Sequence, residues 1–191
     1  TLYVADYGDR LMLLDCGSVS DVDRLRDYLL EIGSDPGRIA LAVVTHMHPD
    51  HAGGALSVRR RYGVPLVAHR DADKWYRGGT GFIQHCLDCY MAQLVAFASG
   101  RRIRRVGYRR TLHADYSVVD GEHLPVFPDW TVVHVPGHTT HDLALFNMTA
   151  GILYCSDCII HVRGKLNLPI PVFFRQMMKT SLARLSALGA S

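Results

Sequence analysis

The sequence lacks several features that mark special classes of protein. No apolar run approaches the roughly 18 residues needed to cross a membrane, so we expect no membrane span. The net charge is only +3, too small to indicate a charged partner by itself. No internal repeat and no linker divides the 191 residues, of which 48% are hydrophobic. We therefore expect one domain over residues 1–191 with a sizeable core.

Cysteine is also scarce. An odd total of five argues against a disulfide framework and favours a reducing compartment, so we expect a cytoplasmic protein. Two C-x-x-C pairs, Cys86 with Cys89 and Cys155 with Cys158, suggest a structural zinc only if the pairs meet in space. Their separation exceeds that of compact zinc modules, and core packing explains them as well. We expect Cys155 and Asp157 to point to the same side of one strand.

Histidine is abundant in one short stretch. His46, His48, Asp50 and His51 directly follow the apolar run 39–44, which is typical of a buried strand. The motif thus lies where α/β sheets place their sites, after the carboxyl end of a strand. Imidazole and carboxylate donors suit zinc, iron or manganese and are too rich in nitrogen for calcium or magnesium.

Two later strands end in further candidate ligands. His138 lies in the segment Val-Pro-Gly-His-Thr after residues 131–135, and Asp157 follows Ile-Leu-Tyr-Cys-Ser. An earlier strand ends in the Asp15-Cys16-Gly17 turn. Together with the H-x-H-x-D-H motif, this ordered set resembles the metallo-β-lactamase superfamily. The resemblance implies an α/β fold, the four-layer αβ/βα sandwich of that superfamily, with the site between its two sheets.

The resemblance also implies a ligand set and a mechanism. His46, His48 and His138 would hold one metal, Asp50 and His51 would begin a second site, and Asp157 would bridge the two. We expect two zinc ions in the full-length protein, with iron or manganese as alternatives. A metal-bound hydroxide would attack an ester, thioester, lactone or amide-type small molecule, and Asp50 would orient it and pass a proton to the leaving group.

Other functions stay open from the residues alone. A single iron at a His-His-Asp set would oxidise a sulfur substrate, although Asp50 and His51 favour two metals. The arginines at 59–61, 101–105 and 109–110 suggest an anion-attracting rim or a phosphodiester and nucleic-acid hydrolase. We do not expect a nucleic-acid partner, because the chain has no room for the extra domain of such relatives. A degenerate scaffold is disfavoured by six intact ligands.

The chain departs from the family in its ends. The family supplies one more histidine after its last helix, and none follows His161. We therefore expect a natural chain that continues past Ser191 and, without an initiator Met at Thr1, one trimmed at the front, which leaves a signal peptide open. His141 and His161 are weaker site candidates. We further expect a helix over 22–32, and a segment over 50–62 that begins at the motif and runs into a helix. A mostly helical insertion around 71–110, broken at Gly78–Gly81, should lie over the metal loops.

Overall fold

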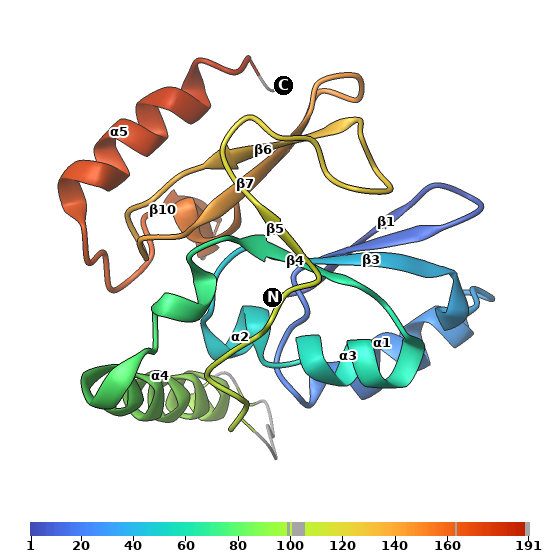
Figure 1. Ribbon diagram of the computed structural model, residues 1–191, viewed down its shortest axis with the longest axis horizontal. Coiled ribbons are helices and arrows are strands. Elements are labelled where there is room, and N and C mark those ends of the chain that lie inside the picture. The colour runs from blue at the N-terminus through green and yellow to red at the C-terminus, as the bar shows by residue number, and fades with distance from the viewer. Residues whose placement is uncertain (99, 101–105, 163, 190–191) are drawn as a thin grey trace. The chain divides into compact units, whose positions relative to one another are not determined.

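The computed structural model describes residues 1–98, 100, 106–162 and 164–189. They fall into two compact units (Figure 1). The first unit comprises residues 1–68 and 72–116, and the second comprises residues 69–71 and 117–191, each apart from its undescribed positions. The predicted arginine cluster at 101–105 lies outside the described residues.

A mixed sheet organises the first unit. In spatial order its strands are β1 (Tyr3–Asp6), β2 (Leu11–Leu14), β3 (Ile39–Val44), β4 (Leu66–His69) and β5 (Tyr116–Val118). The first two strands are antiparallel, and β2, β3 and β4 run parallel. All four residues of β2 and of β4 are buried. Strands covered on both faces need near-continuous apolar runs, which is the pattern of this part of the sequence.

The helices of the first unit are α1 (Asp21–Glu31), α2 (Pro49–Ala52), α3 (Ala55–Tyr62) and α4 (Gly78–Ala98), with short 3₁₀ turns at Pro36–Arg38 and Ala72–Lys74. The apolar residues of α1 are spaced to lie on one face of the helix, and Val22, Leu25 and Leu29 are buried there. The predicted helix over 22–32 is therefore confirmed within one residue at each end.

The segment 50–62 runs into a helix as predicted, and the structure divides it into α2 and α3 at Gly53 and Gly54. A Cβ at Gly54 would lie 2.2 Å from the Cys16 carbonyl oxygen, and the Gly54 amide donates to the Gly17 carbonyl at 2.9 Å. The chain turns at this point because the loop after β2 approaches its backbone closely.

A correction concerns α4. The predicted break at Gly78–Gly81 is instead the first turn of this helix. Gly81 is required there, because its Cβ would lie 2.3 Å from the main chain of Tyr76. The 21-residue helix falls inside the predicted insertion around 71–110.

The second unit is built on antiparallel strands. Its sheet has the order β6 (Trp130–His134), β7 (Leu143–Asn147) and β8 (Ile152–Tyr154), and a separate hairpin pairs β9 (Ile160–Val162) with β10 (Lys165–Asn167). Leu185 of α5 (Arg175–Ser186) packs in a core with Val133, Ala144 and Phe146 of the sheet. The loops after β6 and β8, where the sequence predicts ligands, are thus based on a packed scaffold.

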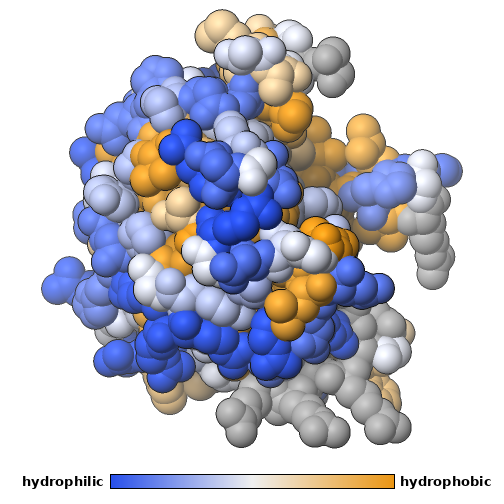
Figure 2. All heavy atoms as spheres, turned by 90° about the vertical axis from the view of Figure 1, so that its right-hand side faces the viewer, coloured by the Kyte–Doolittle hydropathy of each residue, from blue (hydrophilic) through white to orange (hydrophobic). Residues whose placement is uncertain are grey.

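No helix of the described residues is long and apolar enough to cross a membrane. Hydrophilic residues dominate the face shown in Figure 2, where hydrophobic residues lie in separate groups.

Candidate metal centre

The histidine loop after β3 is anchored by a buried carboxylate. Thr45 donates to Asp15 from its main-chain N and from its Oγ1, at 2.8 and 2.9 Å to Oδ1. Nδ1 of His51 lies 2.8 Å from Oδ2 of the same aspartate, and both side chains are fully buried. Asp15 itself has a left-handed backbone with φ of 63°. The ends of β2 and β3 are thereby joined directly beneath the loop.

The imidazole of His46 packs against two other imidazoles of the loop. The ring centroid of His46 lies 4.8 Å from that of His48 and 4.1 Å from that of His51. A ligand nitrogen of His46 lies within 4.8 Å of one on each of these two residues. All three side chains are buried, with their Nε2 atoms inaccessible to solvent.

This donor set fits a metal ion. Asp15 occupies Nδ1 of His51 and so directs its Nε2 toward a ligand, as carboxylates commonly do behind metal-binding histidines. Imidazole nitrogens are suited to zinc, iron and similar ions.

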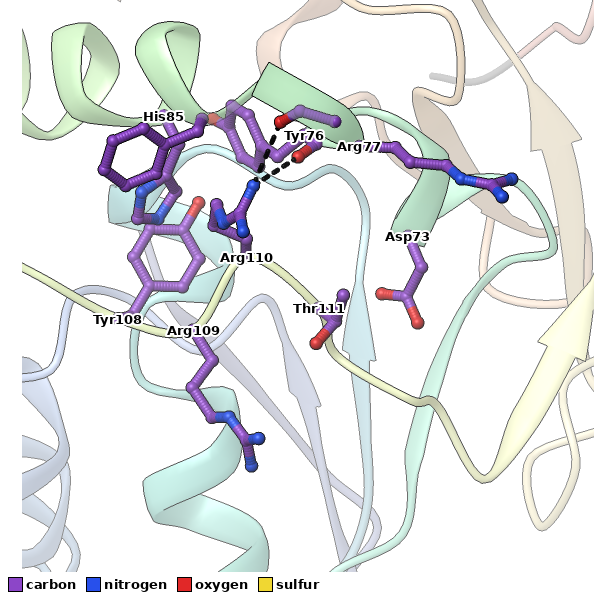
Figure 3. A pocket seen from close by; sticks show the side chains of 10 residues that line it. Asp73, Tyr76, Arg77, His85, Tyr108, Arg109, Arg110 and Thr111 are labelled. Atoms are coloured by element: carbon purple, nitrogen blue, oxygen red, sulfur yellow. Dashed lines mark hydrogen bonds between the residues drawn. The ribbon is translucent and has the colours of Figure 1, made fainter. Parts of the chain in front are cut away.

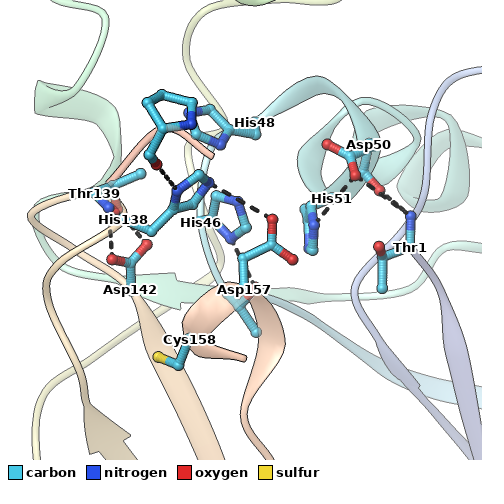
Figure 4. Close-up of polar contacts among 12 residues, drawn as sticks. Thr1, His46, His48, Asp50, His51, His138, Thr139, Asp142, Asp157 and Cys158 are labelled. Atoms are coloured by element: carbon cyan, nitrogen blue, oxygen red, sulfur yellow. Dashed lines mark hydrogen bonds and ion pairs between the residues drawn. The ribbon is translucent and has the colours of Figure 1, made fainter. Parts of the chain in front are cut away.

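Asp50 lies beside this cluster on α2. Its Oδ2 is 3.3 Å from Nε2 of His51, while half of the side chain is exposed (Figure 4). Desolvation acts to raise the pKa of Asp50, but the charge and hydrogen bond of His51 outweigh it and hold that pKa well below its usual value. The carboxylate is therefore ionised at neutral pH, as a metal ligand or proton acceptor must be.

Helix α4 and the segment after it contact the same loop. Tyr76 donates from its hydroxyl to Oδ2 of Asp88 at 2.8 Å, and this oxygen lies 3.7 Å from Nε2 of His48. The hydroxyl of Tyr108 donates to the carbonyl of Met47. Within the first unit, residues of the predicted insertion thus reach the histidine loop.

In the second unit His138 and Asp157 lie together. Nε2 of His138 is 3.6 Å from Oδ2 of Asp157, and Nδ1 is 2.9 Å from the carbonyl of Pro171 (Figure 4). Because a carbonyl only accepts, Nδ1 of His138 donates to Pro171 and Nε2 is the ring nitrogen that faces Asp157. Asp142 accepts from Thr139 N and Oγ1, each at 2.6 Å, which fixes the loop.

The prediction that Cys155 and Asp157 share one side of a strand is wrong. The strand β8 ends at Tyr154, and Asp157 belongs to the 3₁₀ turn Ser156–Cys158. The turn buries the Cys158 side chain, whose Sγ donates to the Val135 carbonyl at 3.7 Å. Of the weaker candidates, His141 is fully buried and His161 is exposed on β9.

Sequence reasoning located Asp15 in its turn but gave it no role, and it missed Asp88. The Asp-x-Gly turn at the end of β2 was a usable signal for Asp15. Nothing local distinguishes Asp88, because its partners Tyr76 and His48 are brought to it by the fold.

An open pocket of about 510 Å³ lies near α4 in the first unit (Figure 3). Arg110 donates from Nη1 to the carbonyls of Tyr76 and Gly78 at 3.2 Å and covers the ring of Phe82. Arg59 and Arg61 form ion pairs elsewhere, with Asp115 at 2.7 Å and Asp23 at 2.6 Å. These three arginines therefore have structural partners within the first unit.

Comparison with known proteins identifies the family. The family model described as the metallo-beta-lactamase superfamily matches residues 1–173. A curated relative, the probable metallo-hydrolase YybB of Bacillus subtilis (strain 168), is 30% identical over 78 residues, which are 41% of this chain and 33% of that protein. The matched segment is thus a third of that relative's length.

Solved structures share the fold. TTHA1429 of Thermus thermophilus, a metallo-beta-lactamase family protein, has a TM-score of 0.70 and 21% identity over 99% of this chain and 65% of its own. TTHA1623 in a di-iron-bound form has a TM-score of 0.63 and 21% identity, covering 98% and 81%. BJP-1, a subclass B3 enzyme of Bradyrhizobium japonicum, has a TM-score of 0.61 and 16% identity, covering 97% and 67%.

The predicted fold class is confirmed by these likenesses, which concern the fold alone at such identities. The family itself is established by the match over residues 1–173, which contain every predicted ligand. The chain belongs to the metallo-beta-lactamase superfamily.

Proposed function

We propose that the protein is a metal-dependent hydrolase acting on an ester, thioester, lactone or amide-type small molecule. The observation that carries this proposal is the buried cluster of His46, His48 and His51, with the ionised Asp50 beside it. A surface histidine cluster would be exposed, whereas these three side chains are buried.

The proposed centre is binuclear. His46, His48 and His138 would hold one metal, Asp50 and His51 would hold the second, and Asp157 would be shared between them. Two observations support this proposal. Each unit assembles one set of donors, and the match to the superfamily covers the donors of both units. Zinc is the proposed ion. Iron and manganese accept the same donors, and TTHA1623 is a relative in fold that binds two irons.

When bound, such metals lower the pKa of water from 15.7 to about 7 and polarise a scissile carbonyl. The residues of the chain supply the remaining requirements. Asp15 and the Pro171 carbonyl hold His51 and His138 in the tautomers that expose Nε2. The carboxylate of Asp50 accepts the proton of the attacking water and donates it to the departing oxygen or nitrogen.

No side-chain nucleophile is needed in this scheme. Burial raises the pKa of the Cys16 and Cys158 thiols far above neutrality, which makes both poor nucleophiles. A single-iron sulfur-oxidising enzyme is the alternative, but it would leave Asp50 and His51 without a role. A phosphodiester hydrolase has less support, because Arg59 and Arg61 already pair with carboxylates.

The test is a panel of chromogenic esters, thioesters, lactones, β-lactams and phosphodiesters, run on full-length protein with defined metal. On the substrate that is cleaved, Asp50→Ala should lower kcat by about 10² to 10⁴-fold. Asp9→Ala is the matched control, since the Asp9 side chain is 76% exposed. Undiminished turnover in Asp50→Ala would refute its role, and cleavage of phosphodiesters alone would refute the proposed substrate class.

A further inference from the structure

Helix α4 has its apolar side turned outward. Its buried residues are Gly81, His85 and Ala96, which are small or polar. Eight large apolar side chains on the same helix are between 42% and 82% exposed: Phe82, Ile83, Leu87, Tyr90, Met91, Leu94, Val95 and Phe97. An ordinary surface helix shows the reverse pattern, with its apolar stripe toward the core. The outer side of α4 therefore has the character of a surface that another molecule covers.

The exposed side chains follow a regular seam. Ile83, Leu87, Tyr90, Leu94 and Phe97 recur at alternating steps of four and three residues. This is the spacing of the a and d positions of a heptad, which brings side chains into one line along a helix that packs against another helix. The seam runs over about 21 Å, at 1.5 Å per residue. Its geometry therefore fits an α-helix as the partner.

The charge of α4 distinguishes the partner further. Asp88 is the one charged residue among positions 78–98, and its carboxylate contacts Tyr76 and His48. Helices that lie on membranes carry Lys and Arg on their polar side, and α4 contains neither. Phe, Tyr and Met are enriched at the centres of protein interfaces, where charged residues are depleted. The composition thus favours a protein as the partner, and α4 does not select that partner by its charge.

The exposed area is sufficient for a stable pair. An exposed side chain of this size offers roughly 100 Å², since aromatic residues bury 150–250 Å² when fully covered. The five side chains of the seam provide about 500 Å² per copy, so two copies bury about 1,000 Å², which is the least that a specific interface needs. An uncharged seam also does not repel an identical seam.

We propose that α4 is a self-association surface, on which the seam of one copy packs against the seam of a second copy of this chain. A two-fold axis crossing the helices makes the contact isologous, the commonest arrangement of homodimers. The metal loop is reached through the opposite side of α4, by Asp88. The proposal is independent of the proposed function, because it rests on no metal ligand and no catalytic residue.

Sedimentation velocity of the full-length protein over a range of concentrations tests the proposal. The wild type should be dimeric, and Leu87→Glu should raise the dimer dissociation constant by more than about 100-fold, because it buries two like charges in the seam. Glutamate keeps a high helix propensity, so the helix itself should persist. The control is Met148→Glu in the second unit, at an apolar residue that is 74% exposed; this variant should stay dimeric.

Folding of the Leu87→Glu protein is checked by circular dichroism and by metal content, both of which should match the wild type. In the wild type, amide exchange in α4 should slow as the protein concentration rises. A wild type that is monomeric at every concentration would overturn the proposal, as would a dimer that survives Leu87→Glu. A monomeric wild type that cosediments with anionic lipid vesicles, and that loses this binding in Leu87→Glu, would also overturn it. That result would assign the seam to a membrane surface.

Discussion

At the scale of the residue, Asp15 holds the histidine loop in place. We predict that Asp15→Asn weakens metal binding by about 10- to 100-fold, because the amide cannot accept from both Thr45 and His51. The free energy of unfolding should fall by about 1–3 kcal/mol, since a buried donor loses its partner. Asparagine tolerates the left-handed backbone of this position, so the turn itself should persist.

Chelator competition measures the affinity and urea unfolding measures the stability. Asp9→Asn provides the comparison at an exposed aspartate. Wild-type affinity in Asp15→Asn would show that the carboxylate is not needed to orient His51.

Asp88 is the corresponding partner of His48. We predict that Asp88→Asn weakens metal binding by about 10-fold, because the amide loses the charge that faces the His48 imidazole. Tyr76→Phe should act in the same direction and more weakly, since it removes only the hydroxyl that positions Asp88. The measurement is again chelator competition, with Asp27→Asn as an exposed control. Equal affinity in Asp88→Asn and wild type would contradict this assignment.

Residues that lie close together in sequence could be predicted, whereas residues joined by the fold could not. The spacing after a buried apolar run is enough to predict the candidate ligands His46, His48, Asp50 and His51. The structure brings their side chains together in the first unit. Asp88 lies 40 positions after His48 in sequence numbering, and no local pattern links the two. The assignment of all six ligands to one centre stays a proposal.

At the scale of the element, Gly137 sets how closely α5 packs on the loop of His138. A Cβ at Gly137 would lie 2.6 Å from the Cα of Met178, which no real Cβ tolerates. We predict that Gly137→Ala lowers the free energy of unfolding by about 1–3 kcal/mol, as overpacking does. Metal affinity should fall as well, because the adjacent histidine moves.

Gly107→Ala is the matched control, since nothing lies within 4 Å of its Cβ position. Thermal unfolding and chelator competition on both variants check the prediction. A Gly137→Ala protein as stable as Gly107→Ala would show that α5 can move away without cost.

The elements that the sequence predicts well are those specified by their own pattern. Ile39–Val44 is a strand in the structure, as predicted, because an apolar, β-branched run suits a strand that is covered on both faces. The helical segment predicted within 50–62 is divided at Gly54, where the constraint is the carbonyl of Cys16, 38 positions earlier. The strand predicted through Asp157 gives way to the turn Ser156–Cys158, because the core of the second unit, not local alternation, buries Cys158.

At the scale of the whole molecule, the order of three motifs along the chain indicates the superfamily, and the family match over residues 1–173 confirms it. The outward apolar side of α4 could not be predicted, because composition shows an apolar helix but not which side the fold leaves exposed. A single domain and a cytoplasmic location stay predictions.

Metal analysis of the full-length protein and its variants tests the central claim, which is the proposed binuclear centre. The wild type should hold about two equivalents of metal. His48→Ala and His138→Ala should each weaken the same site, so the double variant should be little worse than either single one. His113→Ala, at an exposed histidine, should match the wild type. Full metal content and wild-type affinity in His138→Ala would contradict the claim.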